Sequence, residues 1–289
     1  MYDLEKIEPK YSTEEISSFK NEEQLLEATV ELLKQTIELI YIITGLRYCD
    51  QEGNSRQVSR EEAVIGGNLV RLIKLNTSFL QNICELKSEI AFIVSRCIAE
   101  TAINIKYMLI EGGKKVKRNY IKFSLITEKD LWNTIKENTA RRNGDTLGIE
   151  ERMRKSIKRS FETSDFDLDE VSNSSKWKSI SSRAEKVAPP DFYDIFYGVS
   201  SHMIHGNWQD ILFNHIKRKG KELFLNFEWV RPRPQIMDAP ITLNLDIVKT
   251  FAKKELNEIS VKGLLLKKCQ ILLNYHEELV DRHEKMMAE

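Results

Sequence analysis

Residues 191–210 form an apolar segment that carries a regular polar stripe. The stripe recurs every fourth residue, at Tyr193, Tyr197, Ser201 and His205. In an α-helix, four residues turn about 40° beyond one full turn, so these side chains follow one another along one face. A buried polar group without a partner costs roughly 1–3 kcal/mol. The fold must therefore supply partners for this stripe.

A second apolar segment, residues 87–110, predicts a central helix because its apolar residues lie on nearly every side. It has a polar stripe of the same spacing, at Arg96, Glu100 and Asn104. Arg96 and Glu100 are one turn apart and can form an ion pair, and a buried arginine without a carboxylate would be very costly. The simplest packing sets the two stripes face to face, which predicts a polar site between two helices.

The apolar residues of the remaining chain also recur mostly at helical spacing. The predicted helices cover residues 22–46, 60–84, 120–138, 149–161, 177–187 and 246–283, the last with a bend at Gly263. Alternation over 223–230 predicts a strand, with 241–245 as a candidate partner. The predicted fold class is mostly α, a multi-helix bundle with a small β-hairpin excursion near 223–245. Gly66 and Gly67 indicate a close approach of two helices.

Composition indicates a globular chain with a charged surface, since 41% of the 289 residues are apolar and 30% are charged. Residues 1–20 are mostly polar and predict a loosely ordered N-terminal segment, in which Ser12 and Glu15 could cap a short helix. Residues 21–289 predict a single helical-bundle domain. An acidic loop rich in serine and asparagine interrupts it at about 163–175.

Several classes of protein are disfavoured by charge and hydropathy. The 44 basic and 44 acidic residues cancel, so no global attraction to nucleic acid or to an anionic membrane is expected. No apolar run approaches the ~20 residues of a membrane span, and the acidic start of the chain is unlike a signal peptide. The four cysteines show no C-x-x-C spacing. We expect a cytoplasmic protein with no membrane partner and no cofactor.

The candidate site consists of Arg96, Glu100, Tyr197, Ser201 and His205. In one interpretation these side chains form a structural network that fixes the register of two helices. In the other, His205 transfers protons with Ser201 or a tyrosine as its partner, Glu100 orients the imidazole, and Arg96 or Arg71 binds an anion. Gly206 would end the helix at His205 and expose it. Both interpretations stay open on the sequence.

The other histidines and the basic runs give weaker indications. His202 and His205 have the H-x-x-H spacing of metal ligands, but no second pair and no Glu-x-x-His accompanies them, so no metal site is predicted. His276 and His283 lie among glutamates and lysines, which predicts surface positions. The basic run over 141–159 is interleaved with acidic residues, which favours a solvated face over a phosphate site.

The spacings in the two stripes resemble those of a known family. Arg96-x3-Glu100 in one helix, with Tyr193-x3-Tyr197-x3-Ser201-x3-His205-Gly in a later one, resembles an uncharacterised bacterial all-helical family, known only as a domain of unknown function. The resemblance extends over roughly residues 60–210. It implies the fold and the pairing of the stripes, and it implies no reaction.

More loosely, a bundle with a helix-borne histidine is similar to the HEPN superfamily. Its members often act as RNases in toxin–antitoxin, abortive-infection and antiviral defence systems. Those nucleases use an Arg-x(4–6)-His motif on one helix, whereas here the residue four positions before His205 is Ser201. Arg96 from the neighbouring helix could substitute for the missing arginine.

Two function hypotheses follow. The first is a defence- or stress-type effector that acts on RNA or another phosphate-bearing ligand through the Arg/Glu/Ser/His site. The second is a non-enzymatic interaction or scaffold module, which could form a homodimer through an apolar helix face. The sequence leaves enzymatic activity open.

Overall fold

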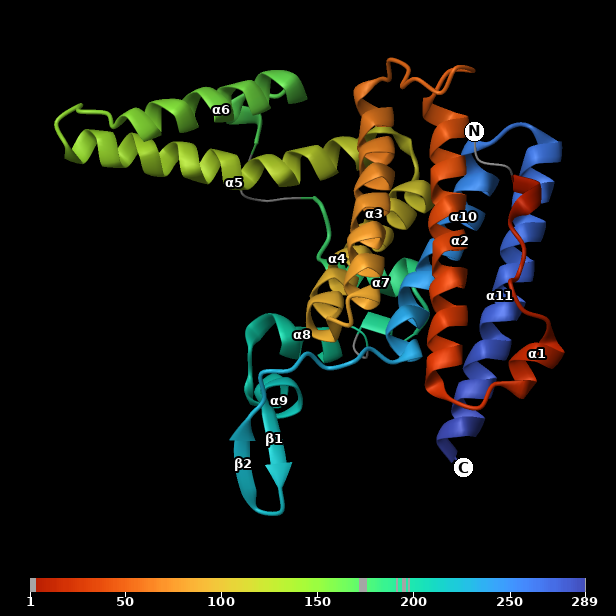
Figure 1. The fold of residues 1–289 in the computed structure, drawn as a ribbon. Coiled ribbons are helices and arrows are strands. Elements are labelled where there is room, and N and C mark those ends of the chain that lie inside the picture. Colours follow the sequence, from red (N-terminus) through yellow and green to blue (C-terminus); the bar gives the residue numbers. More distant parts are fainter. Residues whose placement is uncertain (1–3, 172–175, 191, 194–195, 197, 289) are drawn as a thin grey trace. The chain divides into compact units, whose positions relative to one another are not determined.

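The computed structural model describes residues 4–171, 176–190, 192–193, 196 and 198–288 (Figure 1). The chain is mostly helical, and a two-stranded antiparallel hairpin is the only sheet in this described part. The predicted fold class is therefore confirmed. The chain divides into two compact units. The larger comprises Met1–Gln57, Ile65–Ile110 and Ile180–Glu289, and the smaller comprises Val58–Val64 and Glu111–Ser179.

The larger unit is a helical bundle with several short turns and the hairpin. Its helices are α1 (Thr13–Ser18), α2 (Glu22–Tyr48), most of α3 (Arg60–Cys84), α4 (Ser88–Glu111), α7 (Ile180–Val187), α8 (Gly198–His205), α9 (Trp208–Asp210), α10 (Asp238–Glu255) and α11 (Ile259–Ala288). Helix α10 packs against α2 and α11, and α11 also packs against α2 and α1. Leu25, Leu32 and Leu39 of α2 recur every seven residues and are fully buried, so α2 presents a continuous apolar face to the core.

Short elements complete the larger unit. These are the 3-10 turns η1 (Leu4–Lys6) and η5 (Pro234–Met237), the π-helical turn η4 (Ile211–His215), and strands β1 (Ile216–Lys219) and β2 (Glu222–Leu225). Gly220, with φ +61°, provides the left-handed backbone of the tight turn between the strands. Helix α1 begins with the predicted cap, because Glu15 N donates to Ser12 Oγ and Ser12 N donates to Glu15 Oε2.

The core of the larger unit contains a fully buried polar cluster. The amides of Asn76 in α3 and Asn244 in α10 exchange hydrogen bonds of 3.1 and 3.0 Å. Asn244 Nδ2 also lies 3.1 Å from Thr36 Oγ1 of α2, and Asn76 Nδ2 donates to the carbonyl oxygen of Leu72. Because these partners satisfy both amides, the cluster joins three helices without leaving a buried polar group unpaired.

Of the two glycines that predict a close approach, only Gly66 lies at one. A Cβ on Gly66 of α3 would lie 3.3 Å from the ring of Tyr48, so the absence of a side chain permits close packing there. A Cβ on Gly67 would meet no atom within 4 Å, so the close approach is confined to Gly66. Gly112, with φ +65°, follows the last residue of α4 and ends that helix.

The smaller unit is built on α5 (Gly113–Arg141) and α6 (Gly148–Ser164), which pack against each other, and on η2 (Leu168–Glu170). Its separate core consists of Leu125, Ile135, Ile157, Phe161, Phe166 and Val171. Part of the basic run is engaged inside the unit. Arg142 pairs with the buried carboxylate of Glu150, and Arg154 lies 4.9 Å from the ring centroid of Trp132.

Two predictions of local structure are wrong. Residues 241–245 belong to α10, and β2 pairs instead with β1, in the register Ile216 to Leu225. A short apolar run suits a buried helix as well as a strand, so its periodicity does not distinguish them. The predicted helix over 246–283 is two helices, because Leu256 is extended at φ −102° and ψ 128°. The chain reverses there, and α10 and α11 bury their apolar faces against each other.

Among the residues that the structure describes, no helix combines the length and the hydropathy that a bilayer crossing requires.

Replacing Asn244 with alanine tests the buried cluster. Asn244→Ala leaves the side-chain oxygen of Asn76 buried without its donor, so we expect a loss of roughly 1–3 kcal/mol in the free energy of unfolding. The exposed control Asn274→Ala should stay within about 0.5 kcal/mol. Urea titration measures both, and equal effects of the two changes would contradict the structural role of the cluster.

Candidate functional site

Arg96 and Glu100 lie on α4 and form the predicted ion pair. Arg96 Nε is 3.4 Å from Glu100 Oε1, and the side chains are 19% and 45% exposed. The third member of this stripe, Asn104, accepts a hydrogen bond from the guanidinium of Arg183 in α7. Arg183 is itself buried. One partner of the α4 stripe therefore comes from α7, which the sequence did not indicate.

Ser201 and His205 lie on α8, where Ser201 is half-buried and His205 is exposed. The helix ends at His205, and Gly206 follows with φ +56°, as predicted. Tyr197 lies outside the residues that the structure describes. The ion pair on α4 and the exposure of His205 are thus confirmed, whereas the meeting of the two stripes stays a prediction.

The last turn of α8 is tied to the chain that follows it. Asn207 Nδ2 lies 2.5 Å from His202 Nδ1, and Asn207 Oδ1 accepts from the backbone N–H groups of Gln209 and Asp210. Asn214 Nδ2 lies 3.2 Å from the sulfur of Met203. These contacts hold the turn that carries Asp210 against the end of α8.

The turn after α8 brings an aspartate and a histidine together. Asp210 is buried and accepts a hydrogen bond of 2.8 Å from Asn214 Nδ2. His215 Nε2 lies 3.6 Å from Asp210 Oδ2, and the imidazole is 47% exposed. The carboxylate thus lies close to His215 Nε2 but beyond hydrogen-bond distance, and the half-exposed imidazole is accessible to a ligand.

The π-helical geometry of Ile211–His215 explains this contact. In an α-helix, residues five apart point about 140° away from each other. The i→i+5 hydrogen bonding of a π turn brings Asp210 and His215 to the same side. Such turns occur frequently at functional sites.

Glu89, in the first turn of α4, completes the group. Burial has the largest effect and raises the pKa of Glu89. The charge of His215 and a hydrogen bond from the Val230 backbone lower this pKa, and the charge of Asp210 raises it. Glu89, Asp210 and His215 are therefore close enough to influence one another. We call these three residues and Asn214 the Asp–His cluster.

The charges around the Asp–His cluster are mixed. Glu89 and Asp210 contribute two carboxylates, and the segment after His215 exposes a set of cations, which are Lys217, Arg218, Lys219 and Lys221. Exposed aromatic rings lie in the same segment, with Trp208 at 58% and Phe213 at 70% exposure. The cluster can move a proton at His215, and the neighbouring cations can attract an anionic ligand.

Metal ligation has no support in the described ranges, since no three histidine, cysteine, aspartate or glutamate side chains there are placed to hold an ion. His202, one member of the H-x-x-H pair, is in contact with Asn207.

The prediction of surface positions for His276 and His283 is wrong. Both are buried, and their Nε2 atoms lie 3.0 Å from Asp238 and 2.9 Å from Glu22. Both carboxylates come from other helices, so neighbours in the sequence gave no sign of them. Sequence reasoning also missed Asp210 and His215, because their spacing of five does not fit an α-helical face.

The fold and the site define a mostly α protein with a carboxylate–histidine cluster beside the end of helix α8. Residues 62–223 match the family described as Family of unknown function (DUF5677), and the chain belongs to that family. The match includes α4, α8 and the Asp–His cluster. No curated protein and no solved structure matches the chain.

The shifted pKa of Glu89 gives a pH-dependent prediction. Its raised value means that the folded protein holds this proton more tightly than the unfolded chain, whose ordinary value is 4.5. The ionised carboxylate therefore lowers stability above the folded-state pKa, and this cost vanishes at lower pH. We expect Glu89→Gln to be more stable than the parent at pH 7, with little difference at about pH 4.

Glu85→Gln is the control for this measurement. Hydrogen bonds from Lys87 and then from Gln81 lower the pKa of Glu85, so its ionised form is favoured in the folded protein. Glu85→Gln should therefore give no gain in stability at pH 7. Unfolding by urea at both pH values compares the variants, and a Glu89→Gln protein less stable than the parent at pH 7 would contradict the effect of burial.

Proposed function

We propose that this protein is an effector that cleaves single-stranded RNA by acid–base catalysis beside the end of α8. The observation that supports this most is the approach of half-exposed His215 to within 3.6 Å of Asp210. An imidazole held by a buried carboxylate is a typical general base. The exposed His205 offers a second proton-transferring group on the adjoining helix.

The reaction needs two proton transfers. His215 removes the proton of a ribose 2′-hydroxyl, and the 2′-oxygen attacks the adjacent phosphorus. The bond from phosphorus to the 5′-oxygen breaks, and protonated His205 gives its proton to that leaving oxygen. The products are a 2′,3′-cyclic phosphate and a free 5′-hydroxyl. Asp210 acts as a positioning residue beside the His215 ring.

Binding of the RNA backbone is assigned to the cations around these histidines. The strand after His215 exposes Lys217, Arg218 and Lys219, which offset the charge of the two carboxylates. Arg96 follows Glu89 by seven residues on α4 and so lies on the same helix face. Ser201 precedes His205 by one turn. The resemblance to HEPN nucleases suggests a role in defence or stress response.

Two variants test the reaction on a fluorophore- and quencher-labelled single-stranded RNA. Asp210→Asn and His215→Ala should each lower the cleavage rate by about 100-fold or more, because general acid–base catalysis contributes that much. The exposed control Asp281→Asn should retain the parent rate. The same sequence made of DNA should stay intact, because it lacks the 2′-hydroxyl.

Thermal melting of each variant separates catalysis from folding. The expected result is loss of cleavage with the melting temperature of the parent. Intact RNA after incubation with the parent protein would contradict the proposal, as would full activity in both variants.

The hairpin favours a second function, self-association. Both of its faces are exposed, and an isolated two-stranded hairpin is marginally stable at best in water. We define the hairpin patch as its large exposed apolar side chains and those beside it, namely Phe213, Leu223, Phe224, Leu225, Phe227 and Trp229. Their exposed area is on the order of 800 Å², the share of one partner in a standard interface.

A second copy of this chain is the proposed occupant of the hairpin patch. The open strand edges can pair with the same edges of a partner. A two-fold interface requires such self-complementarity.

Analytical ultracentrifugation of the double variant Leu225→Ser, Phe227→Ser tests this assembly. We expect the parent to form dimers that the double variant loses, because two of the most exposed apolar side chains are removed. Ile259→Ser is the control, since Ile259 is 85% exposed but lies outside the hairpin patch. A monomeric parent at about 100 μM, or a double variant that still forms dimers, would rule out the hairpin as the interface.

A further inference from the structure

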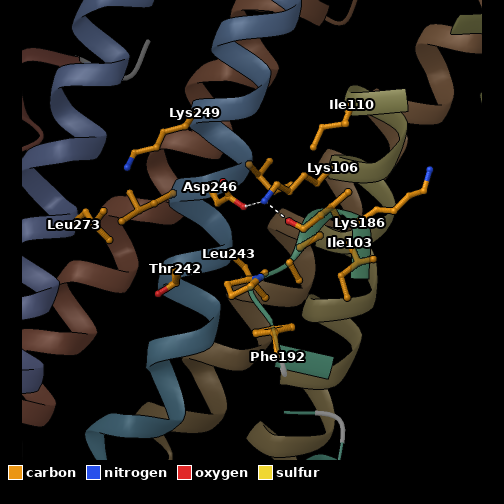
Figure 2. A pocket seen from close by; sticks show the side chains of 16 residues that line it. Ile103, Lys106, Ile110, Lys186, Phe192, Thr242, Leu243, Asp246, Lys249 and Leu273 are labelled. Atoms are coloured by element: carbon orange, nitrogen blue, oxygen red, sulfur yellow. Dashed lines mark hydrogen bonds and ion pairs between the residues drawn. The ribbon is translucent and has the colours of Figure 1, made fainter. Parts of the chain in front are cut away.

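A cavity of about 450 Å³ lies in the larger unit, between α4, α10, α11 and the segment after α7 (Figure 2). Its walls are mostly apolar, and the side chains drawn around it include Ile103, Phe192, Leu243 and Leu273. Cavities of roughly 300–1,000 Å³ with apolar walls and a few polar groups are typical of small-molecule sites. The polar groups of this cavity therefore indicate what it would bind.

An ion pair fixes one wall of the cavity. The ammonium of Lys106 on α4 pairs with Asp246 on α10 and donates to the carbonyl oxygen of Val187, as Figure 2 shows. The side chain of Lys106 is 18% exposed, and that of Asp246 is 38% exposed. These contacts hold three separate segments together, which gives the cavity a defined shape. Asp246 also neutralises the charge of Lys106.

The charge of a second lysine, which lies on α10, is not neutralised in this way. Lys249 lines the same cavity, is half-buried, and has no carboxylate partner among the residues that the structure describes. Lys186 lines the cavity as well. Three lysines and one aspartate leave the lining with an excess of positive charge. An apolar cavity with an excess cation favours a ligand that joins an apolar body to an anionic group.

We propose that this cavity binds a small amphipathic anion, a molecule with an apolar chain or ring and one carboxylate, sulfonate or phosphate group. The anionic group would pair with Lys249, and the apolar body would lie against Ile103, Phe192 and Leu243. The proposal is independent of RNA cleavage. Glu89 and Lys106 are 17 positions apart on α4, so the Asp–His cluster and the cavity are separated by about 25 Å along that helix.

Isothermal titration calorimetry with decanoate tests the site in the full chain. We expect one decanoate to bind per chain, with a dissociation constant on the order of 10–100 μM for a ligand of this size. Lys249→Glu should weaken binding at least tenfold, because an attraction becomes a repulsion. Lys254→Glu makes the same charge change at an exposed position of α10 outside the cavity lining, and it should bind like the parent.

Two further measurements distinguish binding in the cavity from binding to other apolar surface. Thr242 is exposed and lines the cavity, so Thr242→Trp should block decanoate without disturbing the buried core. Neutral 1-decanol should bind at least tenfold more weakly than decanoate to the parent. The proposal is overturned if the parent does not bind decanoate at about 1 mM, or if Lys249→Glu and Thr242→Trp both bind as the parent does.

Discussion

The reciprocal amide pair of Asn76 and Asn244 is the interaction on which the larger unit depends. Both side chains are fully buried, and each is satisfied by partners on other turns or other helices. A shift of α10 by one turn along α3 would separate them and leave buried amides unpaired, at a cost of roughly 1–3 kcal/mol for each group. The apolar faces of these helices alone would tolerate such a shift more easily. The pair therefore specifies one register for α2, α3 and α10.

Helix α4 carries residues of both proposed sites. It is an apolar helix whose polar side chains meet partners from the second half of the chain. Glu89 in its first turn interacts with Asp210 and His215, and Lys106 near its end pairs with Asp246 of α10. Within the polar stripe of α4, Arg96 pairs with Glu100 of the same helix, and Asn104 accepts a hydrogen bond from Arg183 of α7.

Much of the fold follows from local patterns, because an apolar face at helical spacing has few alternatives. The spacing also predicts the Arg96–Glu100 pair, and Gly206 predicts the end of α8, since both depend only on neighbouring residues. The contact between Asp210 and His215 could not be predicted in this way, because it requires a π turn that no periodicity signals. The buried position of His283 likewise depends on Glu22, a partner 261 positions away.

Long-range ¹H–¹⁵N correlation spectra of the histidine side chains test the central role of His215 most directly. Uridine 3′-monophosphate, a mimic of a cleaved RNA end, is titrated into the full chain. The proposed site predicts that the ring resonances of His215 and His205 shift and saturate with the ligand, whereas those of buried His276 and His283 do not move. Unchanged resonances of His215 at saturating ligand would contradict its assignment to the site.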